Sequence, residues 1–280
     1  MRIEVNLNWS SRFCEEEIAN IAQVIEKSGV KKVWAGELDL FRKPTEVAKV
    51  VEEYTSLDVG LIVKPERSIE KLVKKYDICI IPGGKGYESM KTTLLCFEKL
   101  NINAKKVYVG CSGRLMARKA FEKFKTLKMT PRLMPNYIKT EFIEWIIQGL
   151  DWEEILPIGP SLILPSKMVD ELLIAALLVA GSNENFAKKF GFESLYNSVM
   201  SVDVYRMIAN SKLERSDVVK KYEKTLLENF TISGNLRDVA NKIKSLSKFN
   251  GVILADPFFR DINSLKFLKN LIAMVKTPIS

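Results

Sequence analysis

Short runs of apolar, mostly β-branched residues alternate along the chain with longer segments in which apolar residues recur at helical spacing. The short runs predict strands at Ile3–Leu7, Lys32–Ala35, Val59–Val63, Ile78–Ile81, Val107–Val109, Leu127–Thr130, Ser161–Leu164 and Val252–Ala255. The longer segments predict helices at Glu15–Lys27, Thr45–Tyr54, Ile69–Lys74, Tyr87–Leu100, Leu115–Phe124 and Glu141–Gln148. Strands that alternate with helices in this way favour a closed parallel barrel over an open sheet. The expected fold class is therefore α/β, a (β/α)8 TIM barrel.

The alternation stops after the seventh predicted strand. Helical spacing continues from Met168 to Glu228 without a strand, and it is broken near Gly181, Gly191 and Ser211. This stretch is too long for an ordinary barrel crossover. We therefore expect a helical insertion at 168–228 between strands seven and eight, within a single barrel domain that spans 1–280.

The last βα unit has the clearest pattern. Asn235 can cap a helix, and Asp238 follows three residues later in its first turn. The apolar run Gly251–Ala255 then predicts a buried strand, which Asp256-Pro257 ends. One more helix is expected from Ser264 to Val275.

Charge and composition narrow the function classes. The chain has 43 Lys and Arg against 34 Asp and Glu, a net charge of +9 that would attract phosphorylated or polycarboxylate ligands. No basic run is interleaved with aromatic residues, so we expect no nucleic-acid partner. The sequence contains no histidine, which excludes Ser-His and Cys-His nucleophilic relays. No CxxC pair occurs among the four cysteines, so a zinc site is not expected.

The apolar runs give a prediction about localisation. Glu4, Asn6 and Asn8 interrupt the start of the chain, which does not resemble a signal peptide. The longest apolar stretch, Leu172–Ala180, is much shorter than the roughly 20 residues that cross a bilayer. We expect a cytoplasmic protein without a membrane partner.

One strand-to-helix corner is a candidate anion site. The strand Val107–Val109 runs into the turn Ser112-Gly113, and Arg114 opens a helix. The first N–H groups of a helix have no partner inside it, and the helix dipole favours an anion there. The corner can therefore seat a phosphate, although an ordinary structural corner explains the same pattern.

A second glycine-rich turn follows the fourth predicted strand at Gly83 and Gly84. Glycines let a backbone approach a ligand closely or adopt positive φ. The turn matches neither GxGxxG nor a P-loop, and a merely permissive turn is an equal alternative.

The order of several segments resembles the bacterial-luciferase-like superfamily of flavin and deazaflavin oxidoreductases. Members that use coenzyme F420, such as methylenetetrahydromethanopterin reductases, are the most similar in style. The matching segments are Val33–Glu37, Arg42–Thr45, Tyr54–Val63, Val107–Ala120 and Phe230–Pro278.

The resemblance implies an oxidoreductase that transfers a hydride to or from a small-molecule substrate. Its cofactor would be coenzyme F420, with FMN as the alternative, and homodimers would be possible. Ser112 and Gly113, which follow Cys111, would hold the cofactor phosphate, and Arg114 would add charge. The glycine-rich turn at Gly83 and Gly84 also has a counterpart in the family.

Strand three has an implied role as well. The segment Gly60, Leu61, Ile62 and Val63 corresponds to a bulge that backs the cofactor ring. In several relatives that bulge contains a non-prolyl cis peptide, and the matching bond here is Ile62–Val63.

The chain departs from the family where relatives have an Asp-His pair after the second-strand Trp. Here Glu37-Leu38 stands in its place. Glu37 could act as an acid near the ring if burial raised the pKa of its carboxyl, but a solvated or Lys-paired carboxylate is the alternative. The short segment before Val107 also leaves little room for a lid. A second hypothesis is therefore a catalytically degenerate barrel that binds a metabolite or a protein. Arg260 is a further candidate for anion binding, with a salt bridge as the alternative.

Overall fold

The computed structural model of the chain describes residues 1–8, 14–37, 42–65, 69–82, 87–100, 105–204, 207 and 217–277. Its strands pair in parallel in the order β7-β6-β5-β4-β3-β2-β1-β10-β8-β9. Their bounds are β1 (Arg2–Leu7), β2 (Lys32–Gly36), β3 (Asp58–Val63), β4 (Asp77–Ile80), β5 (Val107–Cys111), β6 (Arg132–Pro135), β7 (Glu154–Ile155), β8 (Ile158–Ile163), β9 (Ile232–Gly234) and β10 (Gly251–Ala255).

The sheet curls until β7, at one end, and β8, next to the other end, follow each other in one segment of chain. β7 pairs with β6, β8 pairs with β10, and only Leu156 and Pro157 separate β7 from β8. The N–H of Leu156 donates to the carbonyl of Leu133 in β6 at 2.9 Å, while Ile253 of β10 donates to the carbonyl of Pro157 at 2.8 Å. The ring therefore closes through β1 to β6, the broken strand β7–β8, and β10. β9 pairs with the second half of β8 on the edge opposite β10.

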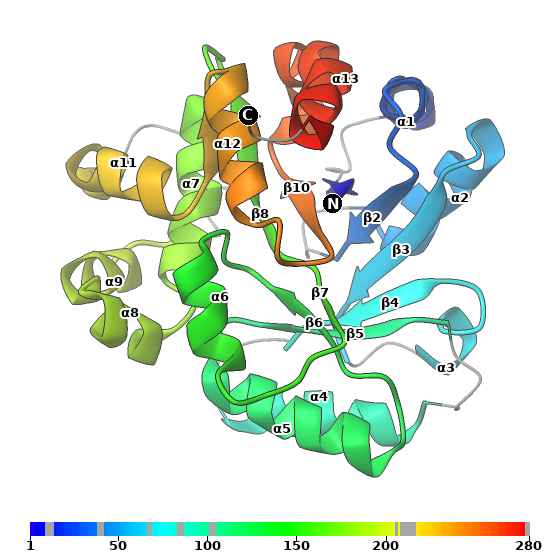
Figure 1. The fold of residues 1–280 in the computed structure, drawn as a ribbon, viewed down its shortest axis with the longest axis vertical. Helices are drawn as coiled ribbons and strands as arrows, with labels where there is room; N and C mark the ends of the chain where they lie inside the picture. Colours follow the sequence, from blue (N-terminus) through cyan, green and yellow to red (C-terminus); the bar gives the residue numbers. More distant parts are fainter. Residues whose placement is uncertain are drawn as a thin grey trace.

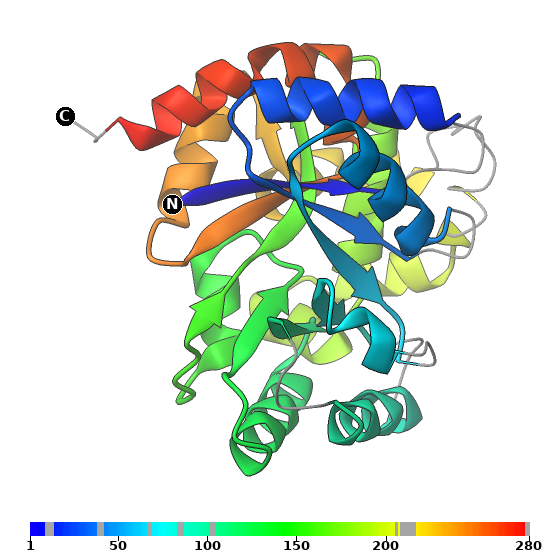
Figure 2. The same ribbon diagram turned by 90° about the vertical axis from the view of Figure 1, so that its right-hand side faces the viewer.

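Helices surround this ring (Figure 1). Seen from the side, α1 and α13 cross above the strands, while α4 and α5 lie below them (Figure 2). The bounds are α1 (Glu15–Lys27), α2 (Pro44–Tyr54), α3 (Ile69–Leu72), α4 (Tyr87–Glu98), α5 (Arg114–Thr126), α6 (Thr140–Ile147), α7 (Val169–Ala180), α8 (Glu184–Phe190), α9 (Glu193–Met200), α11 (Asp217–Asn229), α12 (Leu236–Ser245) and α13 (Ile262–Lys276), with a 3₁₀ turn η1 (Phe258–Arg260).

The predicted helical insertion is present between β8 and β9. It contributes α7, α8, α9 and α11, which gather on the left of the ring in Figure 1. α7 ends at Gly181, and α8 ends at Gly191, whose φ of 74° lies in the left-handed region that suits glycine. Both predicted breaks within the described part of the insertion therefore fall at helix ends.

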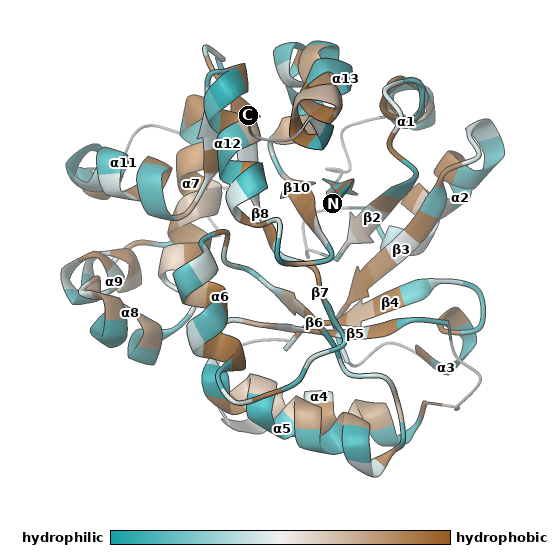
Figure 3. Ribbon diagram, in the orientation of Figure 1, coloured by the Kyte–Doolittle hydropathy of each residue, from teal (hydrophilic) through white to brown (hydrophobic). Residues whose placement is uncertain are grey.

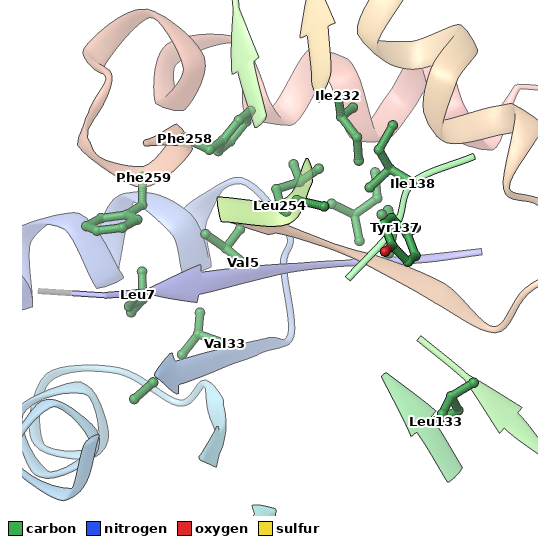
Figure 4. Packing of buried hydrophobic residues seen from close by; sticks show 14 of the residues in the cluster. Val5, Leu7, Val33, Leu133, Tyr137, Ile138, Ile232, Leu254, Phe258 and Phe259 are labelled. Atoms are coloured by element: carbon green, nitrogen blue, oxygen red, sulfur yellow. The ribbon is translucent and has the colours of Figure 1, made fainter. Parts of the chain in front are cut away.

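The hydrophobic core has two layers, because successive side chains of a strand point to opposite faces. The outer layer lies between the strands and the apolar faces of the helices (Figure 3). A part of it is drawn in Figure 4, around Val5, Leu7, Val33, Leu254, Phe258 and Phe259. The inner layer fills the ring with Trp34, Ile62, Cys79, Tyr108, Met134, Leu156 and Ile253.

Trp34 is the largest side chain inside the ring, and it is fully buried. Its indole lies against Gly60 of β3, where an added Cβ would come within 2.5 Å of the ring. It also meets the edge of Tyr108, with ring centroids 5.5 Å apart. The tryptophan of the Val33–Glu37 motif thus packs the barrel interior.

Charged side chains close the amino-terminal end of the ring. Glu154, at the start of β7, makes a salt bridge to Arg2 and others to Arg132 Nε at 3.1 Å and Lys106 Nζ at 3.3 Å. Burial opposes ionisation of this carboxyl, but Arg2, Tyr108 and Lys106 together lower the pKa of Glu154 to about 2. The carboxylate is therefore ionised and holds three strands together at this end.

The predicted sixth strand, Leu127–Thr130, is wrong. α5 continues to Thr126, and Met129 N–H donates back to the carbonyl of Phe124 at 2.9 Å. Lys128 has a φ of 53°, a left-handed conformation that belongs to a turn. The strand begins only at Arg132, after Pro131. The apolar residues Leu127 and Met129, which suggested a strand, belong to the turn that ends the helix.

Candidate functional site

Polar side chains lie at the carboxyl ends of the strands, which we call the mouth of the ring. Asn6 and Asn8 come from β1 and the residues after it, and Asn136 follows β6 directly. A Cβ at Gly36 of β2 would collide with Asn8 Oδ1 and would lie 3.3 Å from Asn6 Nδ2. Gly36 therefore gives the two asparagines of β1 room to lie beside the end of β2.

Several of these amides are buried without a hydrogen-bond partner. Asn6 has no exposed surface, and neither its Nδ2 nor its Oδ1 is paired. Asn8 Oδ1 and Asn136 Oδ1 are likewise buried and unpaired. Each unpaired buried group costs about 1–3 kcal/mol of stability. The arrangement is therefore suited to a ligand that supplies the missing hydrogen-bond partners.

Glu37 stands at the mouth directly after β2. Its N–H donates to the carbonyl of Ile62 at 2.9 Å, and its Oε2 accepts the N–H of Lys64 at 3.0 Å. The residue is 9% exposed. Its carboxyl is therefore fixed between the ends of β2 and β3, where the sequence places the candidate acid.

The predicted ring-backing segment of β3 is a regular strand. It pairs with β2 and β4 through Ile62, which is in register with Gly36 and with Cys79. Ile62 faces the inside of the ring, whereas Leu61 and Val63 pack in the outer layer. Gly60 also faces inward, beneath the Trp34 indole.

The cis peptide expected at Ile62–Val63 is wrong. Among the described residues the cis peptide bonds are Leu164–Pro165 and Asp256–Pro257, both before proline. Continuous pairing of β3 with both neighbours leaves no bulge at Ile62–Val63 for a distorted peptide to occupy.

The strand-to-helix corner lies at the same mouth. Gly113 is the N-cap of α5, and Ser112 Oγ lies 3.5 Å from the carbonyl of Ser182 in the insertion. A Cβ at Gly113 would collide with Asn183 Nδ2, while Asn183 Oδ1 accepts the N–H of Phe186 and caps α8. The turn 182–183 thus covers the corner and presents an amide N–H₂ donor to it.

The side chains next to this corner, those of Cys111 and Arg114, point in different directions. Cys111 packs in the outer layer, where burial raises the pKa of its thiol to about 12 against the opposing effect of a hydrogen bond from the Gly113 backbone. The Arg114 guanidinium lies over the Trp145 ring, 5.9 Å from its centroid.

Arg260, the other candidate for anion binding, makes two 2.7 Å hydrogen bonds to the Asp256 carboxylate, so its guanidinium is engaged in a salt bridge.

Sequence reasoning missed Asn6 and Asn136 as residues of the mouth. Asn6 and Asn8 alternate with Leu7, which is a detectable signal for inward polar positions in a barrel strand. Asn183 gives no such signal, because it reaches the corner from an insertion far along the chain. Gly83 and Gly84 lie outside the described residues.

Within the described ranges, no helix is long and apolar enough to cross a membrane. No group of three or more His, Cys, Asp or Glu residues there is arranged to hold a metal ion.

The sequence matches no protein-family model, and the curated proteins yield no match. Solved structures do match. The coenzyme F420-dependent tetrahydromethanopterin reductase from Methanopyrus kandleri has a TM-score of 0.65 at 15% identity, covering 97% of this chain and 96% of that one. An F420-dependent secondary alcohol dehydrogenase, in complex with an F420–acetone adduct, has a TM-score of 0.61 at 11% identity and covers 99% of both chains.

A third match is the oxygenating constituent of 3,6-diketocamphane monooxygenase from Pseudomonas putida, in complex with FMN. Its TM-score is 0.51 at 12% identity, covering 97% of this chain and 96% of that one. All three alignments run over nearly the whole of both chains. The chain has the barrel fold of these three proteins. At these identities the likeness establishes the fold only. Parallel α/β barrels carry their sites at the carboxyl ends of their strands, where the unpaired asparagines lie.

Proposed function

We propose that the chain is a flavin- or deazaflavin-dependent oxidoreductase, which uses coenzyme F420 or alternatively FMN and acts on a small-molecule substrate. The observation that carries this proposal is the group of buried, unpaired amide atoms at the mouth of the ring. Two of the matching proteins depend on F420 and the third is in complex with FMN, which supports a ring cofactor here. The bound ring would supply hydride transfer.

The residues of the mouth fit such a cofactor. The free N–H groups at the start of α5, the Ser112 hydroxyl and the Asn183 amide are all donors, as a phosphate tail requires. Asn6 offers both a donor and an acceptor to a heterocycle. At Gly113 and Gly36 the side chains of Asn183 and Asn8 already lie too close for a Cβ, so these glycines let polar side chains approach the backbone at the mouth.

Glu37 is the proposed acid. Its backbone and one carboxylate oxygen are both held by β3, which fixes its position at the mouth. A carboxyl fixed at this position could exchange a proton with a bound substrate. Gly83 and Gly84 remain proposed backbone contacts, as does Ile62 on the inward face of β3, whereas Gly60 is covered by the Trp34 indole.

Titration of the purified protein with F420 and with FMN, followed by absorbance, tests the proposal. We expect one of the two to bind with a dissociation constant in the micromolar range, on the order of −8 kcal/mol. The +9 net charge should favour the more anionic cofactor at low salt. Failure of both to bind at high micromolar concentration would refute the proposal.

Replacing Glu37 with Gln should lower turnover by about 100-fold, because a positioned acid typically contributes 10²–10⁴ in rate. Gln keeps an oxygen that can accept the Lys64 N–H, so cofactor affinity should not change. Glu46→Gln, at an exposed position of α2, is the control. Unchanged turnover in Glu37→Gln would remove this residue from the chemistry.

A second candidate function is binding without turnover. It is favoured by the absence of histidine from the whole chain and by the hydrogen bond that the Lys64 backbone N–H donates to the Glu37 carboxylate. Oxidation of the reduced cofactor by any substrate, with multiple turnovers, would exclude this alternative.

A further inference from the structure

Among the described residues of the mouth, Asn6 is the side chain with both polar atoms unpaired. It lies one residue before the end of β1, in register with Trp34 of β2, and its exposed fraction is 0%. Both of its amide atoms lack a partner, so the carboxamide would cost stability whichever way it is turned. Two positions earlier on the same face, Glu4 is paired, since its Oε2 accepts the Trp34 indole N–H at 2.5 Å.

The two unpaired atoms limit the chemistry of a guest. A phosphodiester or a fully ionised phosphate has only acceptors to offer and an ammonium only donors, so each would leave one Asn6 atom unpaired. A cyclic amide or imide edge carries N–H next to C=O and pairs with both atoms at once. The pyrimidine edge of a flavin or deazaflavin ring is such a group.

Asn8 lies beside Asn6 at the end of β2. A Cβ at Gly36 would meet both Asn8 Oδ1 and Asn6 Nδ2, and Asn8 Oδ1 is itself unpaired. A ligand could therefore displace the Asn8 oxygen without breaking a hydrogen bond made by that atom.

We propose that Asn6 is the specificity-determining residue that hydrogen-bonds the pyrimidine edge of the ring cofactor. Its Oδ1 accepts the ring N–H and its Nδ2 donates to the adjacent ring carbonyl. This inference rests on the proposed function. It assigns the ring edge to β1 and the phosphate tail to the start of α5, two separate parts of the mouth.

Binding of lumichrome, F420 and FMN to the wild type and to Asn6→Leu tests the assignment, with Asn241→Leu on the exposed face of α12 as the control. Lumichrome has the pyrimidine edge but no phosphate tail. We expect Asn6→Leu to bind lumichrome and the preferred cofactor at least tenfold more weakly, and Asn241→Leu to bind them as the wild type does. Inorganic phosphate should not displace lumichrome.

The unliganded proteins distinguish ligand recognition from a structural role. Leu removes two unpaired buried amide atoms, so Asn6→Leu should melt at or above the wild-type temperature without ligand. If it melts lower and also loses binding, Asn6 is paired to internal water and the proposal is overturned. If Asn6→Leu binds as tightly as the wild type, the proposed function stands and this inference fails. If the wild type binds neither cofactor, the proposed function fails and this inference with it.

Asn6→Asp provides a second variant of the same shape. A protonated Asp donates and accepts as Asn does, whereas an ionised Asp only accepts. Its affinity for lumichrome should therefore fall as pH rises between about 5 and 8, while wild-type affinity stays nearly constant. A flat profile for Asn6→Asp at wild-type affinity would contradict the assignment.

Discussion

Replacing Glu154 with Gln should lower the free energy of unfolding by about 3 kcal/mol, because it leaves partly buried cations without their counter-charge. Glu154 is 7% exposed and is bonded to Arg2, Arg132 and Lys106. Urea unfolding followed by circular dichroism measures the change. A loss below about 1 kcal/mol, the usual value of an exposed pair, would show that the network is solvated.

Glu4→Gln is the matched comparison within the same barrel interior. Burial raises the pKa of Glu4, although the hydrogen bond from Trp34 and the charges of Lys32 and Arg2 oppose the rise. Gln retains an oxygen for the indole N–H and carries no charge to bury. We expect Glu4→Gln to be neutral or stabilising at neutral pH, and a loss as large as that of Glu154→Gln would contradict this reasoning.

The two carboxyls also predict opposite dependence on pH. The folded pKa of Glu154, about 2, is below its ordinary value of 4.5, so its stabilising effect is present above 4.5 and is lost as pH falls toward 2. The folded pKa of Glu4 is raised, so its contribution is largest below its ordinary value and is lost as pH rises through the folded pKa. Stability curves of the two Gln variants against wild type between pH 3 and 7, roughly the range in which carboxyls titrate, should therefore diverge in opposite directions.

Gly60→Ala should destabilise the barrel by about 3 kcal/mol through overpacking. The new Cβ would come within 2.5 Å of the Trp34 ring, and β3 cannot retreat because it pairs with strands on both sides. Trp34→Phe in the same chain should recover part of the loss, giving a coupling of at least about 1 kcal/mol in a double-mutant cycle followed by circular dichroism. Additive effects would mean that the indole moves aside freely.

Much of the fold could be predicted because its signals are local. The first helix, Glu15–Lys27, matches its prediction at both ends, and the Asn235–Asp238 capping box is present as expected. The sixth strand was misplaced because helix ends and strands share apolar residues there. β9 was missed because it is only three residues long and lies directly before a helix cap.

The site could be predicted only in outline. The corner at Ser112 and Gly113 lies at the mouth, as the barrel pattern requires. The side chain that covers this corner is that of Asn183, and no local sequence pattern predicts a contact between residues 70 positions apart. The Arg114 guanidinium lies over Trp145 for a similar reason, since the packing of α5 against α6 decides where it rests.

The pairing of β1 with β10 has a consequence for synthesis on the ribosome. Residues 2–5 pair with residues 251–254, so the first strand to emerge must wait for almost the last one to be made. Until then the nascent chain presents an unsatisfied strand edge, which is a template for wrong partners. Release of chains truncated before residue 251 should therefore yield aggregates, and a chaperone that shields the amino-terminal segment during translation would raise the yield of native protein.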